Sequence, residues 1–157
     1  MDDPIEVSLE AVHLYESSKR FLDADNFRDA AELLEHALVP FPERPFFWTE
    51  LGTCYRDDKR TIEAAFCYSR AKAIDPNNFS VAFHLAVLKA DIGSWAEAEE
   101  HFKDALRLKP SDTHTLMNLA GVLRKLQKLE ESEALVRRAL ELDPSLVGSL
   151  PPTGKSS

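Results

Sequence analysis

Four prolines recur along the chain at a constant interval of 34 residues. They are Pro42, Pro76, Pro110 and Pro144. The same interval links four alanines, Ala37, Ala71, Ala105 and Ala139. A fixed period of this length indicates an array of structural repeats, each of which is one supersecondary unit that packs on its neighbours. We therefore divide the chain into four copies, at about residues 11–44, 45–78, 79–112 and 113–146.

Each copy is predicted to form two helices. In copy two, Trp48, Leu51 and Tyr55 recur at helical spacing, and a polar break near residues 57–59 ends this first helix. The second helix ends before Pro76, because proline cannot donate the next helical hydrogen bond and restricts the residue before it. Each copy is thus a helical hairpin. One position of the first helix is always small in copies two to four: Gly52, Ala86 and Ala120.

Copy two resembles the full tetratricopeptide repeat signature. The residues that carry the resemblance are Trp48, Leu51, Gly52, Tyr55, Ala64, Tyr68, Ala71 and Pro76. The likeness covers about residues 11–146, with departures at Ser17 and Ser18 in copy one and at Lys89 in copy three. It implies an all-α, right-handed superhelical solenoid of about four helix-turn-helix hairpins.

The two ends of the array depart from the repeat. Residues 1–10 are predicted to extend the first helix, which starts near Pro4 because proline suits the first helical turn. Residues 147–157 are predicted to form a short tail that is disordered or folds back, since Pro151 and Pro152 stop any helix.

Copy four lacks the extra solvating helix that usually closes such an array. Its Leu126, Leu135 and Leu140 therefore form a candidate end-to-end interface, because exposed apolar patches mark contact sites. Three alternatives stay open at this point. The tail folds back over these leucines, two chains pack end to end as a homodimer, or the chain is cut from a longer array.

The resemblance also implies a binding groove, formed by the first helices on the concave side. The family's inward-facing positions place the following residues in it: Tyr15, Lys19, Phe46, Thr49, Glu50, Thr53, Arg56, Phe83, His84, Val87, His114, Met117, Asn118 and Arg124. The alternative for Phe46, Phe83 and Met117 is packing between hairpins. An apolar middle with acidic residues toward copies one to three favours a protein or peptide partner with apolar anchors and some basic character.

One known use of the family is the binding of acidic carboxyl termini of heat-shock chaperones, by a clamp of Lys, Asn, Asn, Lys and Arg. The matching places here hold Tyr15, Lys19, Glu50, Ser80 and His84. The clamp is absent, and we expect no tight binding to such termini.

Charge and composition exclude other classes of function. The net charge is −8, and residues 1–44 alone carry 4 basic against 11 acidic side chains. Such an end repels nucleic acid and anionic membranes. No apolar stretch approaches the roughly 20 residues that cross a bilayer, and the start lacks the pattern of a signal peptide. We expect a cytoplasmic protein that binds neither nucleic acid nor membrane.

No set of residues has catalytic spacing, and we expect no enzyme activity, cofactor or metal. His84 and His114 are expected to face each other, but no third ligand accompanies them. The residues Gly154-Lys155-Ser156 lack the strand and helix of a phosphate-binding loop. The leading hypothesis is a non-catalytic interaction module: an adaptor, assembly scaffold or chaperone-like holder. The alternatives are a structural oligomerisation unit that acts through its last copy, and an accessory domain of a larger enzyme complex.

Overall fold

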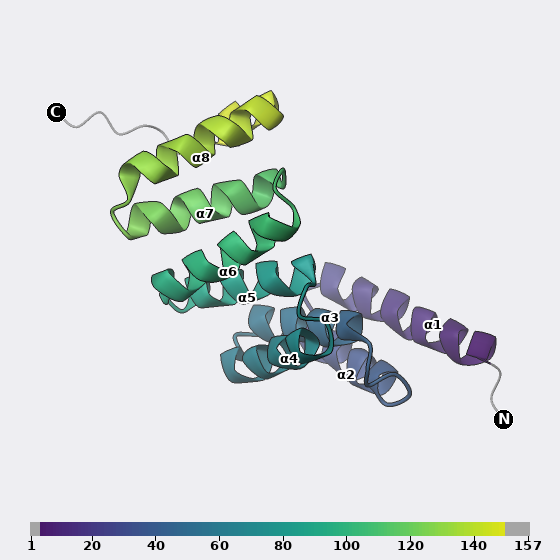
Figure 1. The fold of residues 1–157 in the computed structure, drawn as a ribbon. Helices are drawn as coiled ribbons and strands as arrows, with labels where there is room; N and C mark the ends of the chain where they lie inside the picture. Colours follow the sequence, from purple (N-terminus) through teal and green to yellow (C-terminus); the bar gives the residue numbers. More distant parts are fainter. Residues whose placement is uncertain (1–3, 150–157) are drawn as a thin grey trace.

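A computed structural model describes the backbone of residues 4–149 and the side chains of residues 9–148. This part of the chain contains helices and no strand (Figure 1). The helices are α1 (Pro4–Asp23), α2 (Phe27–Leu38), α3 (Pro45–Asp57), α4 (Thr61–Ile74), α5 (Phe79–Asp91), α6 (Trp95–Leu108), α7 (Thr113–Lys125), α8 (Leu129–Leu142) and the 3-10 helix η1 (Pro144–Ser149). None of these helices is both long enough and apolar enough to traverse a bilayer.

A left-handed turn joins the two helices of every hairpin. The turn residues have positive φ and lie 34 residues apart: Asp25 (55°), Lys59 (63°), Gly93 (78°) and Gln127 (61°). In the last hairpin, the N–H of Gln127 donates to the carbonyl of Arg124 at 3.1 Å, and the N–H of Lys128 donates to that of Leu123 at 2.9 Å. This is the Schellman arrangement, which satisfies carbonyls that the helix end leaves free.

The connections between hairpins combine a proline with a cap. Asn78 and Asp112 accept hydrogen bonds from the N–H groups three residues later, and so start α5 and α7. Copy one differs, because α2 ends at Leu38, two residues before Pro40. The 34-residue period around Pro42 does not reveal this earlier stop. A longer link therefore precedes α3.

The four hairpins stack into a solenoid, with α1 and α8 at its opposite ends (Figure 1). Each first helix packs on the second helix of its own hairpin, and each second helix packs on the next first helix. In addition, α3 contacts α5 and α5 contacts α7, so the first helices draw together on one side. That side is the concave face, and the second helices form the convex face. The predicted all-α solenoid of helical hairpins is confirmed.

The core runs through the whole stack in two clusters. One includes buried residues from α1 to α5, and the other joins α5 and α6 to α7. Because α5 contributes Leu85 to the first cluster and Ala86 to the second, the two meet at that helix. Burial of this apolar surface is the main source of stability in an array whose repeats cannot fold alone.

A polar link also ties the third hairpin to the fourth. The carboxylate of Glu99 in α6 is buried, and it accepts bonds from the ammonium groups of Lys103 at 2.5 Å and Lys128 at 2.9 Å. The bond from Lys103, with a smaller contribution from Lys128, holds the pKa of Glu99 below its usual value. A buried carboxylate held by two cations keeps its charge without an unpaired group in the core.

The ends of the stack differ from the middle. At 20 residues, α1 is longer than α3, α5 and α7, which have 13 each. After α8, the helix η1 packs back against α8 and leaves Leu146 half-buried. Residues 150–157 of the predicted tail lie outside the described part of the chain.

Candidate functional site

An aromatic hollow lies at the first turn of α3, where α1 and the link before α3 meet it. The rings of Tyr15 and Phe46 pack edge to face with their centroids 4.9 Å apart. Phe46 is 47% exposed, and its ring also packs edge to face with that of Phe47, with the centroids 5.5 Å apart. The hollow has a volume of about 320 Å³ and is lined by Ala11, Val12, Tyr15, Phe41, Arg44, Phe46 and Phe47. It is wide enough for one apolar side chain of a partner.

The link between α2 and α3 supplies part of this hollow. The rings of Phe41 and Phe47 stack with centroids 6.3 Å apart, which fixes the back wall. Sequence reasoning did not predict Phe41, Arg44 or Phe47 as site residues. The signal was the second proline, Pro40: α2 ends early before it, and the longer link that follows contributes Phe41 and Arg44 to the hollow.

One carboxylate and two basic residues lie at the hollow: Glu50 and Lys19 beside it, and Arg44 in its lining. Glu50 of α3 is half-buried, and burial raises the pKa of its carboxyl, although the positive charge of Lys19 partly opposes this rise. Burial and the nearby Glu50 also raise the pKa of Tyr15. A partly desolvated carboxylate attracts an added cation more strongly than a hydrated one does. Glu50 therefore offers one place for a basic group, with Lys19 near it and Arg44 in the lining of the hollow.

One predicted groove residue belongs to the core. Thr49 is only 2% exposed, and its hydroxyl donates to the carbonyl of Pro45 at 2.8 Å. Its placement in the groove was wrong, because α3 turns this position toward the neighbouring helices. Thr53, one turn later, is half-buried and lies 3.1 Å from the hydroxyl of Tyr68.

The middle of the groove is charged and tightly paired. The guanidinium of Arg56 donates to the carboxylate of Asp57 at 2.9 Å and lies 3.9 Å from that of Asp91 in α5. Burial lowers the pKa of Arg56, but the nearby Tyr68, the hydrogen bond to Asp57 and the two carboxylates together outweigh it, and the pKa is raised. A predicted basic groove residue is thus already neutralised by two acids.

Further along, the predicted aromatic and aliphatic residues serve mainly the core. Phe83 meets Phe102 at 5.9 Å, and both Phe83 and Val87 pack on the second core cluster. Phe83 thus packs on the second helix of its own hairpin and is half-buried, and its contact with a partner stays a prediction. Met117 in α7 is half-buried.

His84 is an unusual residue of the groove floor. Its ring stacks on Tyr68 at 5.7 Å, and its buried Nδ1 has no hydrogen-bond partner among the described residues. Burial, and then the charge of Arg56, lowers the pKa of His84 to about 4. Within residues 9–148, no group of three His, Cys, Asp or Glu side chains is placed to hold a metal ion.

The far end of the groove is open to solvent. His114, Asn118 and Arg124 are all exposed, and the amide of Asn118 donates to the carbonyl of His114 at 3.0 Å. Of the predicted groove residues, Tyr15, Lys19, Phe46 and Glu50 thus gather at the first two hairpins, whereas these three form a separate polar end.

The candidate end-to-end interface is more covered than we predicted. Leu126 and Leu135 pack on the second core cluster, and Leu140 is half-buried. Packing on the core leaves less of Leu126 and Leu135 free than an unpaired last copy suggests, and the end-to-end interface stays a prediction. The exposed apolar residues at this end are Leu129, Leu142 and Val147.

Comparison with known proteins agrees with this geometry. The tetratricopeptide repeat family model matches residues 15–79 and 83–146. Superkiller protein 3 of Schizosaccharomyces pombe is 27% identical over 120 residues, which are 76% of this chain and 9% of that protein. The peroxisomal targeting signal receptor of Candida glabrata is 31% identical over 88 residues, which are 56% of this chain and 15% of the receptor. The chain therefore spans only a small part of these relatives.

Solved structures show the same fold. MamA from Desulfovibrio magneticus superposes with a TM-score of 0.76 at 17% identity, over 86% of this chain and 76% of that one. The first tetratricopeptide domain of Spaghetti (RPAP3), solved with the HSP90 peptide SRMEEVD, superposes with a TM-score of 0.71 at 17% identity, over 76% of this chain and 95% of that one. Proteins of this family generally mediate protein–protein interactions and are typically not catalytic. With the family model matched over most of its length, the chain belongs to the tetratricopeptide repeat family.

Proposed function

We propose that the chain is a non-catalytic holder of another protein, which it binds through a segment laid in the concave groove. The observation that carries the proposal is the hollow between Tyr15 and Phe46, with the half-buried Glu50 beside it. A preformed aromatic hollow suits an apolar side chain of the partner, because rings that are already ordered lose little conformational entropy on binding. The carboxylate of Glu50 then favours a lysine or arginine in the bound segment.

The proposal separates this groove from one that holds acidic chain ends. At the places where the family's clamp carries cations and amides, this chain has Tyr15, Glu50 and His84 among others. Glu50 repels a carboxylate, and the low pKa of His84 keeps its ring neutral. We expect no measurable binding of the peptide SRMEEVD, with the RPAP3 domain as the positive control. Tight binding would contradict the assignment of the groove to a basic segment.

The proposed place of action is the cytoplasm, as a single chain. Free, buried thiols at Cys54 and Cys67 support a reducing compartment. The covered state of Leu126 and Leu135 weighs against an end-to-end dimer through those leucines. Light scattering of the purified chain measures this directly.

The experiment that tests the groove is affinity capture from the source cells with three versions of the chain. Wild type is compared with Phe46→Ser and with the matched control Val39→Ser, which removes an apolar side chain that is 82% exposed and lines no part of the hollow. We expect one specific protein to be retained by wild type and Val39→Ser and lost with Phe46→Ser. Circular dichroism checks that helicity is kept. Equal retention by all three versions would refute the groove as the binding site.

A further inference from the structure

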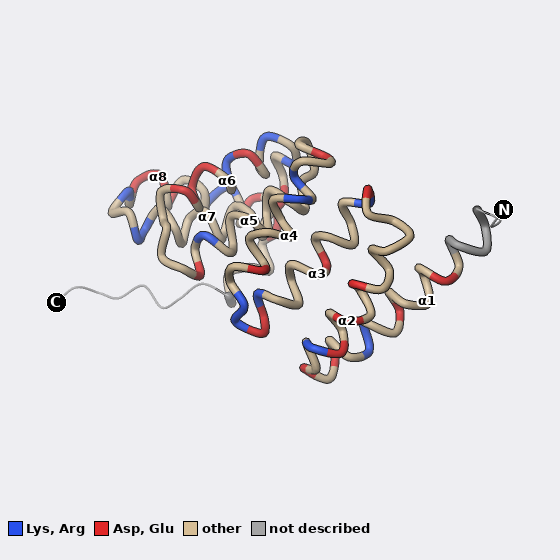
Figure 2. The backbone as a smooth tube through the Cα atoms, turned by 90° about the horizontal axis from the view of Figure 1, so that it is seen from below, with Lys and Arg blue, Asp and Glu red and all other residues tan. Residues whose placement is uncertain are grey.

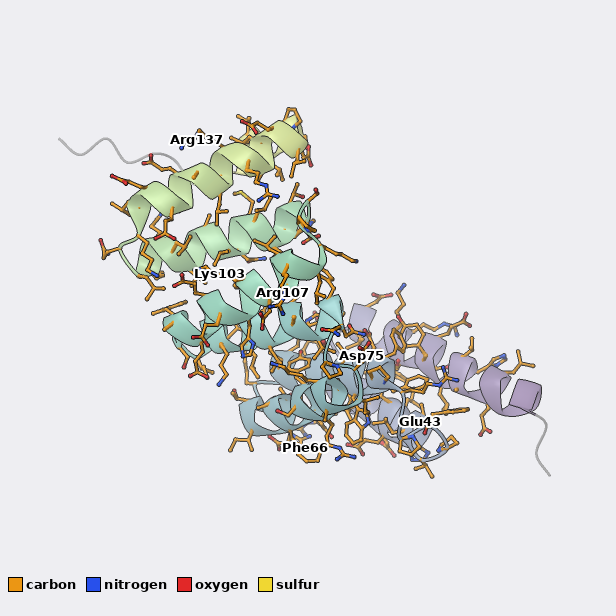
Figure 3. The ribbon with its side chains drawn as sticks, viewed as in Figure 1. Glu43, Phe66, Asp75, Lys103, Arg107 and Arg137 are labelled. Atoms are coloured by element: carbon orange, nitrogen blue, oxygen red, sulfur yellow. The ribbon has the colours of Figure 1, made fainter. Side chains whose placement is uncertain are left out.

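The convex face carries an apolar patch that the groove does not use. Ile62 and Phe66, one turn apart on α4, are 83% and 59% exposed. Figure 3 shows Phe66 at the outer edge of the molecule, on α4. Beside them is a hollow of about 460 Å³. Its lining consists of Glu35, Trp48, Tyr55, Ile62, Glu63, Phe66 and Cys67.

The repeat itself shows that folding does not require these apolar residues. The matching exposed positions of the other hairpins hold the pairs Arg28 and Glu32, Ala96 and Glu100, and Glu130 and Ala134. Each of these pairs includes a charged side chain and lacks a large apolar one. Because the three other hairpins stack with such residues, the Ile62–Phe66 pair calls for an explanation outside the packing of the array.

The indole of Trp48, which backs the patch, is held in place by three contacts. It meets the ring of Phe66 edge to face, with centroids 5.9 Å apart. Its Nε1–H donates to the carbonyl of Pro42 at 2.8 Å, and the guanidinium of Arg70 lies 5.7 Å from its ring. A platform held in this way loses little conformational entropy when a partner packs on it.

Two carboxylates line the hollow, and two guanidinium groups lie against its rings: Arg60 is 4.4 Å from the ring of Tyr55, and Arg70 is 5.7 Å from that of Trp48. The carboxylates are those of Glu35 and Glu63, and the lining itself contains no basic side chain. The carboxylate of Glu63 accepts a bond from Arg60 at 3.0 Å. Glu35 accepts only a bond from the neutral hydroxyl of Tyr55, and none of the ion pairs of residues 9–148 includes it. Figure 2 shows further acidic residues along α1 and α2. An incoming cation would therefore meet Glu35.

We propose that this convex hollow is a second binding site, which takes a short segment of a partner protein with an apolar side chain next to a lysine or arginine. The apolar side chain packs among Trp48, Ile62 and Phe66, and the cation pairs with Glu35. This site is separate from the groove and does not rest on the groove's function. With both sites occupied, the chain joins two protein segments on opposite faces.

Size and charge favour such a segment over a second copy of the chain. A stable dimer buries roughly 800 Å² on each partner, which is far more than two side chains and an indole edge provide. Packing of the patch on its own copy would also place two apolar patches together while leaving Glu35 of each copy, which makes no ion pair among the described residues, without the cation that a basic segment supplies.

A peptide selection tests the proposal even though the partner protein is unidentified. A library of random peptides displayed on phage is selected on the wild-type chain and counter-selected on the double variant Ile62→Arg, Phe66→Glu. Arginine and glutamate are tolerated at these positions because the first hairpin carries the same pair, Arg28 and Glu32. Selected peptides are then synthesised and titrated, with the fluorescence of Trp48 as the signal. Trp48 is the sole tryptophan once Trp95 is replaced by phenylalanine.

We expect the selected peptides to share an apolar residue next to a lysine or arginine. Their affinity should fall about tenfold or more in the double variant, as for the loss of a buried anchor. The variant Ala96→Arg is the matched control, because it creates the same Arg–Glu pair with Glu100 on the third hairpin and should leave affinity unchanged. The substitution Glu35→Lys should lower the affinity of the selected peptides. Replacing the lysine or arginine of those peptides by glutamate should then restore binding.

Several results would overturn the proposal. Peptides that bind wild type and the double variant equally would show that the patch is not the site. If the selected peptides are acidic, or if their affinity is the same for wild type and Glu35→Lys, the proposed pairing of a cation with Glu35 is wrong. A wild-type dimer that becomes a monomer in the double variant, measured by light scattering, would assign the patch to a second copy instead. Because Phe46 is unchanged throughout, failure here is distinct from failure of the groove.

Discussion

The two helices of the second hairpin approach each other closely at Gly52 in α3, where the ring of Tyr68 from α4 lies against the backbone. A Cβ atom at Gly52 would be 2.6 Å from Cε1 and 2.8 Å from Cδ1 of that ring. Tyr68 is fully buried, and its hydroxyl is 3.1 Å from that of Thr53. The ring therefore has no free direction in which to move, and Gly52→Ala forces a clash in the core.

Two opposing terms set the size of the effect. Alanine stabilises a helix interior by about 1 kcal/mol relative to glycine, whereas overpacking a core costs about 1–3 kcal/mol. Gly121 in α7 provides the matched control, because it is exposed and a Cβ there would meet no described atom within 4 Å. Gly121→Ala should raise the free energy of unfolding by about 1 kcal/mol. The free energy of unfolding of Gly52→Ala should be lower than that of Gly121→Ala by about 1–3 kcal/mol, and its melting temperature lower by about 2–12 °C.

The assay is urea and thermal unfolding of both variants, followed by circular dichroism at 222 nm, the usual helix signal. A third comparison locates the cause: with Tyr68→Leu as the background, Gly52→Ala should become neutral or stabilising, because the first hairpin pairs Leu34 with Ser18 at these places. Equal stability of Gly52→Ala and Gly121→Ala would refute the reasoning, since the ring would then yield without cost.

Two further predictions concern the turns and the buried histidine. Gln127→Gly should raise the free energy of unfolding by up to about 1 kcal/mol, because glycine relieves a positive φ that costs other residues about 1–2 kcal/mol. Gly93→Ala should lower the free energy of unfolding by a similar amount. A more stable Gly93→Ala variant in urea unfolding would contradict the role of the turn. The low pKa of His84, about 4 against 6.5 when unfolded, means that below pH 6.5 the unfolded chain binds a proton that the folded chain does not. Stability should be complete above pH 6.5 and fall toward pH 4 by at most about 3 kcal/mol, and His84→Gln should flatten this slope in urea titrations repeated at several pH values.

The array could be predicted from the sequence because every repeat packs on its neighbours in the same way. Positions 34 residues apart occupy equivalent surroundings, so their shared size and polarity disclose the period, the hairpin and the helix ends. The small residues at Gly52 and Ala86 likewise mark where two helices approach. The turns at Lys59 and Gln127 were less visible, because the backbone holds the left-handed conformation without glycine there.

The candidate site depended on the tertiary structure. A helical period assigns a side chain to a face, but it cannot tell how deeply the next hairpin covers that face. Thr49 and Phe83 were predicted as groove residues, yet neighbouring helices bury the first and pack on the second. The hollow at Phe46 needs Phe41, which comes from a link that breaks the period.

What the sequence alone determined was therefore the local and repeating part of the molecule: the helical hairpins, their number and the side of each helix that faces its partner. What only the tertiary structure decided was which side chains stay free after stacking, such as Phe46 on one face and Ile62 with Phe66 on the other. The physical reason is that exposure is a property of the assembled array. It depends on residues from three or four helices at once, whereas periodicity reports one helix at a time.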